Sequence, residues 1–314
     1  MTSITNLLKQ GIVLGDGGYL IELERRGYVD SGSRREKVGT GKGSGQFTPE
    51  VAIEHPDALR QLHREFLRAG SQALQALTFF GTREKLQRAG FGAQTEAINR
   101  AAVGLAREVA GGSALVAGSV SRTQLLEREG PAALGQARDL IAEQIRLLKD
   151  AGVDFLILET FFRLDEVLAA LDAANTSGLP AVATLSFRPL IARCSDDHTP
   201  AECARALADH GAIAAGANCE QEPARMLPLL REMRQATSIP IAAQPAAFRT
   251  TGQCHCFTRQ PAFPDDLETI QVSRREFFEF GKSAKTEGLG YVGGCCGCNA
   301  AYILALADGL AAAK

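Results

Sequence analysis

Two adjacent cysteines lie near the C-terminal end of the chain, within Gly293-Gly294-Cys295-Cys296-Gly297 and directly after the short apolar run 289–292. The flanking glycines supply the unusual backbone angles that a tight turn needs. This pattern indicates a pair of thiolates that the backbone presents without crowding. A catalytic Zn²⁺ normally takes three ligands from the protein and leaves one position open, so such a pair needs a third ligand.

Cys219 is the best candidate for the third ligand, because it follows another apolar run typical of a strand, 212–216. The sequence by itself does not show whether the two strand ends meet. A vicinal disulfide or two buried thiols are the competing interpretations of Cys295-Cys296. The glycine frame and a reducing compartment both argue against them.

The composition predicts one large domain that acts on a small molecule. The chain has 314 residues, a hydrophobic fraction of 45% and a formal net charge of −2. Because α/β barrels of about this length form a single core, we expect one domain over residues 1–314. The small net charge and the lack of long basic or acidic runs argue against nucleic acid or an anionic membrane as a partner.

We also expect a cytoplasmic protein. No segment approaches the length of an apolar membrane span, and the first fifteen residues lack the pattern of a secretory signal. Cytosolic thiols stay reduced, so the eight cysteines favour metal ligation or catalysis over disulfides. Cys203, inside a helical pattern, is interpreted as a small apolar filler.

Two other segments carry weaker signals. The stretch 31–46 is rich in Gly, Ser, Lys and Arg without apolar periodicity, and is interpreted as a loop insertion, either solvated or closing over the site. A second possible metal cluster has Cys-x-Cys spacing, which is tighter than the usual Cys-x₂-Cys knuckle, so we expect its members not to bind metal. These members are Cys254, His255, Cys256 and Cys298.

Apolar runs typical of strands alternate with helical patterns along the whole chain. The predicted strands are 12–14, 73–79, 114–117, 153–158, 180–185, 212–216, 239–243 and 289–292. Two capping boxes, Thr199 to Glu202 and Ser273 to Glu276, predict helix starts. The alternation predicts a (β/α)₈ TIM barrel. An open doubly wound sheet is the runner-up, but no Gly-x-Gly-x-x-Gly turn follows the first strand.

In such a barrel the carboxyl ends of all strands share one rim, where barrel enzymes keep their chemistry. Cys219 is therefore expected to meet Cys295 and Cys296. Asp16 follows the first strand and Glu159 ends the fourth, so both carboxylates are expected on the same rim. As alternatives, Asp16 only organises its turn, and Glu159 forms a structural ion pair.

These residues resemble a known family, the zinc-dependent homocysteine S-methyltransferases, and most closely its betaine-homocysteine branch. The resemblance rests on Gly-Asp-Gly-Gly after the first strand, Asn-Cys after the sixth and Gly-Gly-Cys-Cys-Gly after the last, and it extends over about residues 11–310. It implies that Cys219, Cys295 and Cys296 bind Zn²⁺, with the homocysteine sulfur in the fourth position. A zinc-bound thiol loses its proton, and a small onium donor, betaine-like or sulfonium, then supplies the methyl group that forms methionine.

The resemblance also implies how the substrates bind. Asp16 and Glu159 would hold the amino group of homocysteine, since two carboxylates can clamp an ammonium, and the backbone around Gly17-Gly18 would approach its carboxylate. The chain has no Trp, so an aromatic cage for the donor would fall to phenylalanines 79, 80, 161 and 162. The expected substrate-binding residues are Asp16, Gly17, Gly18, Thr78, Phe80 and Glu159.

Several alternatives stay open at this point. The donor could be S-methylmethionine, S-adenosylmethionine or another compound, and the acceptor could be a different thiol. A hypothesis outside the enzyme class is a non-catalytic zinc-binding or thiol redox-sensing barrel. The sequence is also compatible with a homo-oligomer.

Overall fold

The computed structural model describes residues 3–29, 49–188, 191–254, 256–263 and 265–313. The predicted insertion 31–46 and His255 lie outside these residues. Within them, eight strands form one parallel sheet in the order β1-β8-β7-β6-β5-β4-β3-β2. The strands are β1 (Val13–Leu14), β2 (Ala73–Ala76), β3 (Leu115–Ser121), β4 (Phe155–Phe161), β5 (Ala181–Leu185), β6 (Ala214–Asn218), β7 (Ile241–Gln244) and β8 (Tyr291–Val292).

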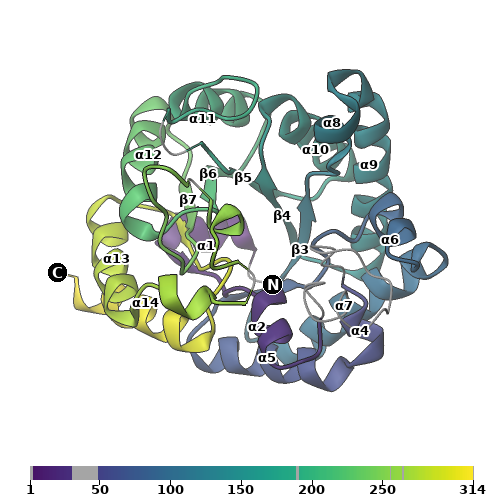
Figure 1. Ribbon diagram of the computed structural model, residues 1–314, viewed down its shortest axis with the longest axis horizontal. Coiled ribbons are helices and arrows are strands. Elements are labelled where there is room, and N and C mark those ends of the chain that lie inside the picture. The colour runs from purple at the N-terminus through teal and green to yellow at the C-terminus, as the bar shows by residue number, and fades with distance from the viewer. Residues whose placement is uncertain (1–2, 30–48, 189–190, 255, 264, 314) are drawn as a thin grey trace.

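The helices surround the strands as an outer ring (Figure 1). Together with the strand order, this ring confirms the predicted (β/α)₈ barrel. The α-helices of the described residues are α1 (Ile4–Gln10), α2 (Leu20–Arg25), α4 (Val51–Glu54), α5 (Pro56–Arg68), α6 (Arg83–Arg88), α7 (Thr95–Ala110), α8 (Leu125–Glu129), α9 (Leu134–Ala151), α10 (Leu164–Ser177), α11 (Pro200–Asp209), α12 (Pro223–Ala236), α13 (Arg274–Thr286) and α14 (Ala300–Ala312).

The first and last strands join the two ends of the sheet. β1 pairs with β8 in the register Val13 to Tyr291. On its other side, the backbone N–H of Gln72 donates to the carbonyl of Leu14 at 2.7 Å, so β1 also meets the start of β2. The closed arrangement places all strand ends on common rims.

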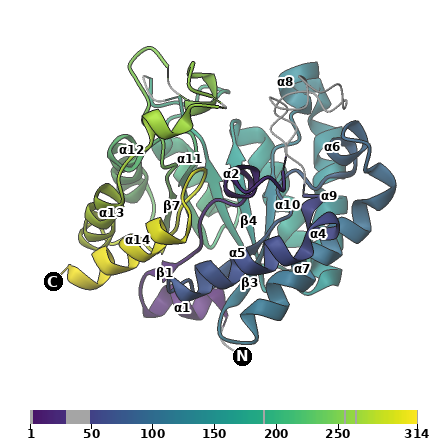
Figure 2. The same ribbon diagram turned by 60° about the horizontal axis from the view of Figure 1, so that its bottom comes forward.

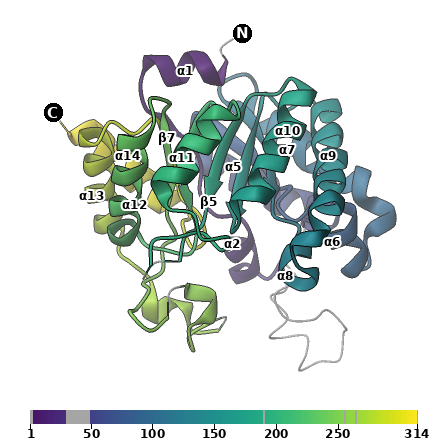
Figure 3. The same cartoon turned by 90° about the horizontal axis from the view of Figure 1, so that it is seen from above.

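The core has two layers, one inside the barrel and one between the strands and the helices. Inside, Phe155 and Tyr291 pack with Ile4 of α1. Helix α1 lies at the end of the barrel opposite α2 and α8 (Figures 2 and 3). It therefore covers the amino-terminal end and leaves the carboxyl-terminal rim for loops. No helix in the described part of the chain is long and apolar enough to cross a bilayer.

Local signals account for several boundaries. Thr199 and Ser273 form the predicted capping boxes, so α11 and α13 begin where the sequence indicates. The fourth strand is longer than predicted: it continues past Glu159 to Phe161, and its pairing with β5 is irregular between Leu158 and Phe161. Thr160, with φ of 58°, lies at this bulge. The short helices α1, α4, α6 and α8 were not predicted.

Candidate metal centre and substrate cavity

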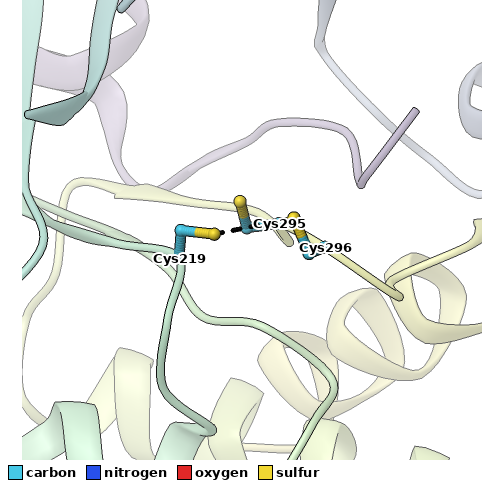
Figure 4. Close-up of side chains that lie close together, drawn as sticks. All are labelled: Cys219, Cys295 and Cys296. Carbon is cyan, nitrogen blue, oxygen red and sulfur yellow. Dashed lines mark hydrogen bonds between the residues drawn. The ribbon is translucent and has the colours of Figure 1, made fainter. Parts of the chain in front are cut away.

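Three cysteines from two strand ends meet at the carboxyl-terminal rim. Cys219 directly follows β6, and Cys295 and Cys296 come shortly after β8 (Figure 4). The Sγ atoms of Cys219 and Cys296 are 3.6 Å apart, and all three sulfur atoms lie within 4.8 Å of one another. Cys219 is buried, whereas Cys295 and Cys296 are half-buried. This is the one such group of potential metal ligands among the described residues.

The last residue of β7 and the residue that follows it hold the two cysteine segments together. The N–H of Cys219 donates to the carbonyl of Gln244, and the N–H of Cys295 donates to the carbonyl of Pro245, both at 2.9 Å. Cys219 has φ of 57°, a left-handed conformation that is uncommon for a residue other than glycine. A Cβ on Gly294 would lie 2.4 Å from the Cβ of Cys298, so only glycine fits there.

The sulfur atoms of Cys219 and Cys296 are spaced as a tetrahedral metal site requires. Metal–sulfur bonds of about 2.3 Å in a tetrahedron separate the sulfur atoms by about 3.8 Å, close to the 3.6 Å between Cys219 and Cys296. Thiolates favour soft or borderline metal ions over Mg²⁺ or Ca²⁺. The hydrogen bond with Cys295 and burial raise the pKa of the Cys219 thiol well above its usual value. A bound cation would therefore be needed to hold these groups as thiolates.

The three cysteines form one side of a cavity at the rim. Its other walls come from the turn after β1, from β2 and β4, and from the end of β7. Three of the expected substrate-binding residues line it, namely Gly17, Gly18 and Glu159. A Cβ on Gly18 would come within 2.4 Å of the carbonyl oxygen of Cys295, so this wall requires glycine.

Asp16 lies beside this cavity and is fully buried. Its Oδ2 accepts hydrogen bonds from the hydroxyl of Tyr19 and from the backbone N–H of Gln75, the latter at 2.6 Å. Its Oδ1 has no hydrogen-bond partner in the described structure. Burial raises the pKa of Asp16 to about 7, against the opposing effect of these hydrogen bonds.

Glu159 lines the cavity from β4. Its Oε1 accepts hydrogen bonds from the side chains of Gln75 and Ser119, whereas Oε2 has only a long contact of 3.4 Å with Asn218 Nδ2. Burial raises the pKa of Glu159 to about 7, and the nearby charge of Asp16 adds to this effect. Within the described residues, no basic side chain is near enough to lower either pKa. Among the described residues, Glu159 thus has no partner for a structural ion pair.

Thr78 and Phe80 lie behind the cavity wall. The Thr78 hydroxyl donates to the carbonyl of Ser119 at 2.7 Å and accepts from its N–H at 3.0 Å, so it ties the segment that follows β2 to β3. The ring of Phe80 lies under the ammonium group of Lys85, which is 4.3 Å from the ring centroid. Neither residue lines the cavity.

The four phenylalanines of the expected cage are not assembled around the cavity. Phe79 lines it, but Phe161 is fully buried in the core. The guanidinium of Arg122 lies 3.9 Å from the ring centroid of Phe162. A cation of the protein itself therefore occupies a ring face that the sequence suggested for the donor.

Several polar residues of the site were not predicted from the sequence. Gln75 and Gln244 are amides within apolar strand patterns, and both line the cavity. His63 lies on the buried face of α5 and contacts the Tyr19 hydroxyl. A polar residue on a buried face needs a partner, and this requirement was the signal in the sequence that could have marked these residues. The cysteines expected not to bind metal lie outside the three-sulfur cluster: Cys203, Cys254, Cys256 and Cys298.

Comparisons with known proteins show which family this chain resembles. A family model described as homocysteine S-methyltransferase matches residues 13–310. Betaine–homocysteine S-methyltransferase 1 of Bos taurus is 36% identical over 319 residues, which cover 96% of this chain and 72% of the relative. An S-methylmethionine–homocysteine S-methyltransferase of Pongo abelii is 36% identical over 308 residues, which cover 96% of this chain and 78% of the relative.

A solved structure is similar in fold. It is the metallated form of the homocysteine methyltransferase MmuM of Escherichia coli, with a TM-score of 0.71 and 22% identity, and the match covers 95% of this chain and 96% of that chain. At this identity the likeness supports the barrel fold alone.

Proposed function

The chain belongs to the homocysteine S-methyltransferase family, and we propose that it transfers a methyl group from a small onium donor to the sulfur of homocysteine, which forms methionine. The observation that carries this proposal is the content of one cavity. Three sulfur atoms lie on one side of it. On another side, the carboxylate of Glu159 lines the cavity and that of Asp16 lies beside it, and neither has a basic partner in the described part of the chain. An amino acid with a thiol fits both sides at once.

The proposed metal ligands are Cys219, Cys295 and Cys296, and the proposed metal is Zn²⁺. The sulfur spacing and the all-thiol donor set support this choice. When bound, zinc would keep the acceptor thiol deprotonated at neutral pH, where a free thiol is mostly protonated. Three protein ligands would leave a further position for the acceptor, and the cysteines line the cavity from which it would enter.

The amino group of homocysteine would be held by acceptor atoms that lack donors. Oδ1 of Asp16 and Oε1 of Gln244 have no partner in the described structure, and Oε2 of Glu159 has only its long contact with Asn218. An ammonium group has three N–H donors and no acceptor, so it matches this set. Its positive charge would also offset the cost of two buried carboxylates.

The remaining expected residues would shape the acceptor site. The backbone of Gly17 and Gly18 would approach the homocysteine carboxylate, because both form the wall where no Cβ fits. Thr78 would keep β2 and β3 in register behind that wall. Phe80 would support Phe79, whose ring centroid is 4.2 Å from its own. With the amino group and the sulfur both fixed, the protein aligns the acceptor for in-line attack on the methyl group.

The donor would approach past Phe79, which is the cage residue that lines the cavity. One aromatic ring still favours a cation, so a betaine-like or sulfonium donor fits. The relatives named for betaine and for S-methylmethionine are equally identical to this chain, so they do not separate the two donors.

The test combines metal analysis with turnover. The purified protein is assayed for zinc and for methionine formation from homocysteine with betaine, dimethylsulfoniopropionate, S-methylmethionine or S-adenosylmethionine supplied singly. We expect one equivalent of zinc and turnover with one of these donors. Reversible thiol oxidation without methyl transfer would support the redox-sensing alternative, and absence of zinc would reject the proposed centre.

A further inference from the structure

Tyr19 connects Asp16 to a buried histidine. It immediately precedes α2, lines the cavity and is 5% exposed. Its hydroxyl donates a hydrogen bond to Oδ2 of Asp16 and lies 3.0 Å from Nδ1 of His63 on α5. Two segments, the turn that carries Asp16 and Tyr19 and helix α5 with His63, thus share one hydrogen-bonded chain beside the acceptor site.

The protons of this chain can be assigned from the hydrogen-bond network. The Tyr19 hydroxyl has a single proton, which it gives to the ionised Asp16. His63 must then donate from Nδ1 to the oxygen of Tyr19. Burial lowers the pKa of His63 to about 3, so the imidazole is neutral. Its Nε2 carries no proton in this tautomer, and Nε2 has no partner in the described structure.

Packing fixes the Tyr19 ring as well as its hydroxyl. The ring makes an edge contact with Phe66, with centroids 5.1 Å apart, and a tilted contact with His63 at the same separation. A Cβ on Gly17 would lie 2.8 Å from the Phe66 ring, so the turn that carries Asp16 also packs against Phe66. The phenol therefore has one available orientation.

We propose that Tyr19 is a positioning residue for acceptor binding: anchored by His63, it keeps Asp16 charged and turned so that Oδ1 faces the amino group of the acceptor. This inference rests on the proposed function for the identity of the acceptor. The link between Tyr19 and Asp16 is independent of that function, because it exists in the free protein.

The groups that face Asp16 define what loss of the hydroxyl would do. They are Tyr19, the Gln75 N–H from β2, the carboxylate of Glu159 from β4 and the hydroxyl of Tyr291 from β8. Burial already raises the pKa of Asp16. Removing one of its two hydrogen-bond donors raises the pKa further, because the charged form loses a partner that the neutral form needs less.

The direct test measures Asp16 itself. Protein labelled with ¹³C at the aspartate carboxyl carbons is titrated by NMR without substrate, and Asp16→Asn identifies the signal. We expect Tyr19→Phe to raise the pKa of Asp16 by about one unit, as loss of one charged hydrogen bond predicts. An unchanged pKa would overturn the inference. The matched control is Tyr302→Phe, which removes a buried hydroxyl bonded to the carbonyl of Val272.

Kinetics with zinc-loaded enzyme then test the role in acceptor binding. Tyr19→Phe should raise the KM for homocysteine about tenfold at pH 6 but less than about twofold at pH 9, where Asp16 is ionised in both proteins. The value of kcat should change little. An equal rise at all pH values, or a loss confined to kcat, would contradict a role through Asp16. Tyr302→Phe should leave the KM and its pH dependence unchanged.

His63 supplies a second, independent check. His63→Gln should raise the KM for homocysteine in the wild-type background but not further in Tyr19→Phe, because both act through one chain. Additive effects would refute the anchoring by His63. If the NMR titration shifts as expected but no donor yields methionine, the proposed function fails while the link between Tyr19 and Asp16 stands. If methionine forms and the titration does not shift, the inference alone fails.

Discussion

Replacing Glu159 with glutamine keeps the shape of the side chain and removes its charge, so it separates binding of the acceptor from packing of the barrel. Oε1 of the new amide can still accept from the Ser119 hydroxyl, which bonds to the carboxylate now. What is lost is the negative charge on the cavity wall. A charged hydrogen bond of this kind contributes about 1.5–3 kcal/mol, so the KM for homocysteine should rise about 10- to 150-fold.

Glu159→Gln should weaken acceptor binding but increase the stability of the fold. The pKa of Glu159 is raised from 4.5 to about 7, which means that the folded state favours the protonated form. The associated stability is present below pH 4.5 and is lost as the pH rises through 7. At about 1.4 kcal/mol for each pKa unit, the ionised carboxylate costs the metal-free protein about 3 kcal/mol at pH 8.

Glu159→Gln should therefore increase the free energy of unfolding of the metal-free protein by up to about 3 kcal/mol at pH 8 and by less than about 1 kcal/mol at pH 5. Urea denaturation at both pH values measures this, and steady-state kinetics of the zinc-loaded enzyme measure the KM. The control is Glu166→Gln. Glu166 is also buried with a raised pKa, but it accepts from the N–H and hydroxyl of Thr123 and does not line the cavity.

The reasoning about Glu159 would be refuted by an unchanged KM combined with a loss of stability at pH 8. That pair of results would make Glu159 a packing residue of β4. We expect Glu166→Gln to leave the KM unchanged, so a rise in its KM would show that loss of any buried carboxylate disturbs the site.

Three further substitutions test the centre and the fold. Cys296→Ala should abolish both zinc binding and turnover, whereas Cys203→Ala should retain one equivalent of zinc by metal analysis; full zinc occupancy in Cys296→Ala would remove that residue from the ligand set. Gly18→Ala should reduce turnover at least tenfold, because its Cβ would lie 2.4 Å from the carbonyl oxygen of Cys295; wild-type kinetics would show that this wall can shift. Thr199→Ala should lower the free energy of unfolding, measured by urea denaturation, by about 1 kcal/mol through loss of its capping box. The KM should stay unchanged, and a changed KM would link α11 to the site.

The sequence predicted the parts of the site that depend on strand order. Once eight strands alternate with helices, Cys219 and the cysteines after the last strand must share a rim, and the structure brings their sulfur atoms together. Asp16 and Glu159 were placed by the same reasoning. Capping boxes at Thr199 and Ser273 also gave helix starts correctly, because the signal is local.

Contacts between distant side chains could not be predicted in this way. Arg122 covers the ring of Phe162 because the loop after β3 passes the end of β4, and no local pattern reveals that placement. The bulge at Thr160 was missed for a similar reason: an apolar run fixes neither the register with the next strand nor the point where it slips. His63 was a polar residue on an apolar helix face, but its partner comes from a turn 44 residues earlier.

Asn218 explains how the sulfur atoms and the carboxylate come to share one cavity. Its Oδ1 accepts from the backbone N–H of Thr160 and from the hydroxyl of Thr184, both at 2.8 Å, so it fixes the bulge that follows Glu159. Its Nδ2 lies 3.4 Å from Oε2 of Glu159 and 4.0 Å from Sγ of Cys295. One buried amide on β6 thus contacts the bulge after Glu159, the carboxylate itself and the sulfur cluster. In the proposed acceptor site, the separation between amino group and thiol would therefore be set by residues on and directly after the strands of the barrel.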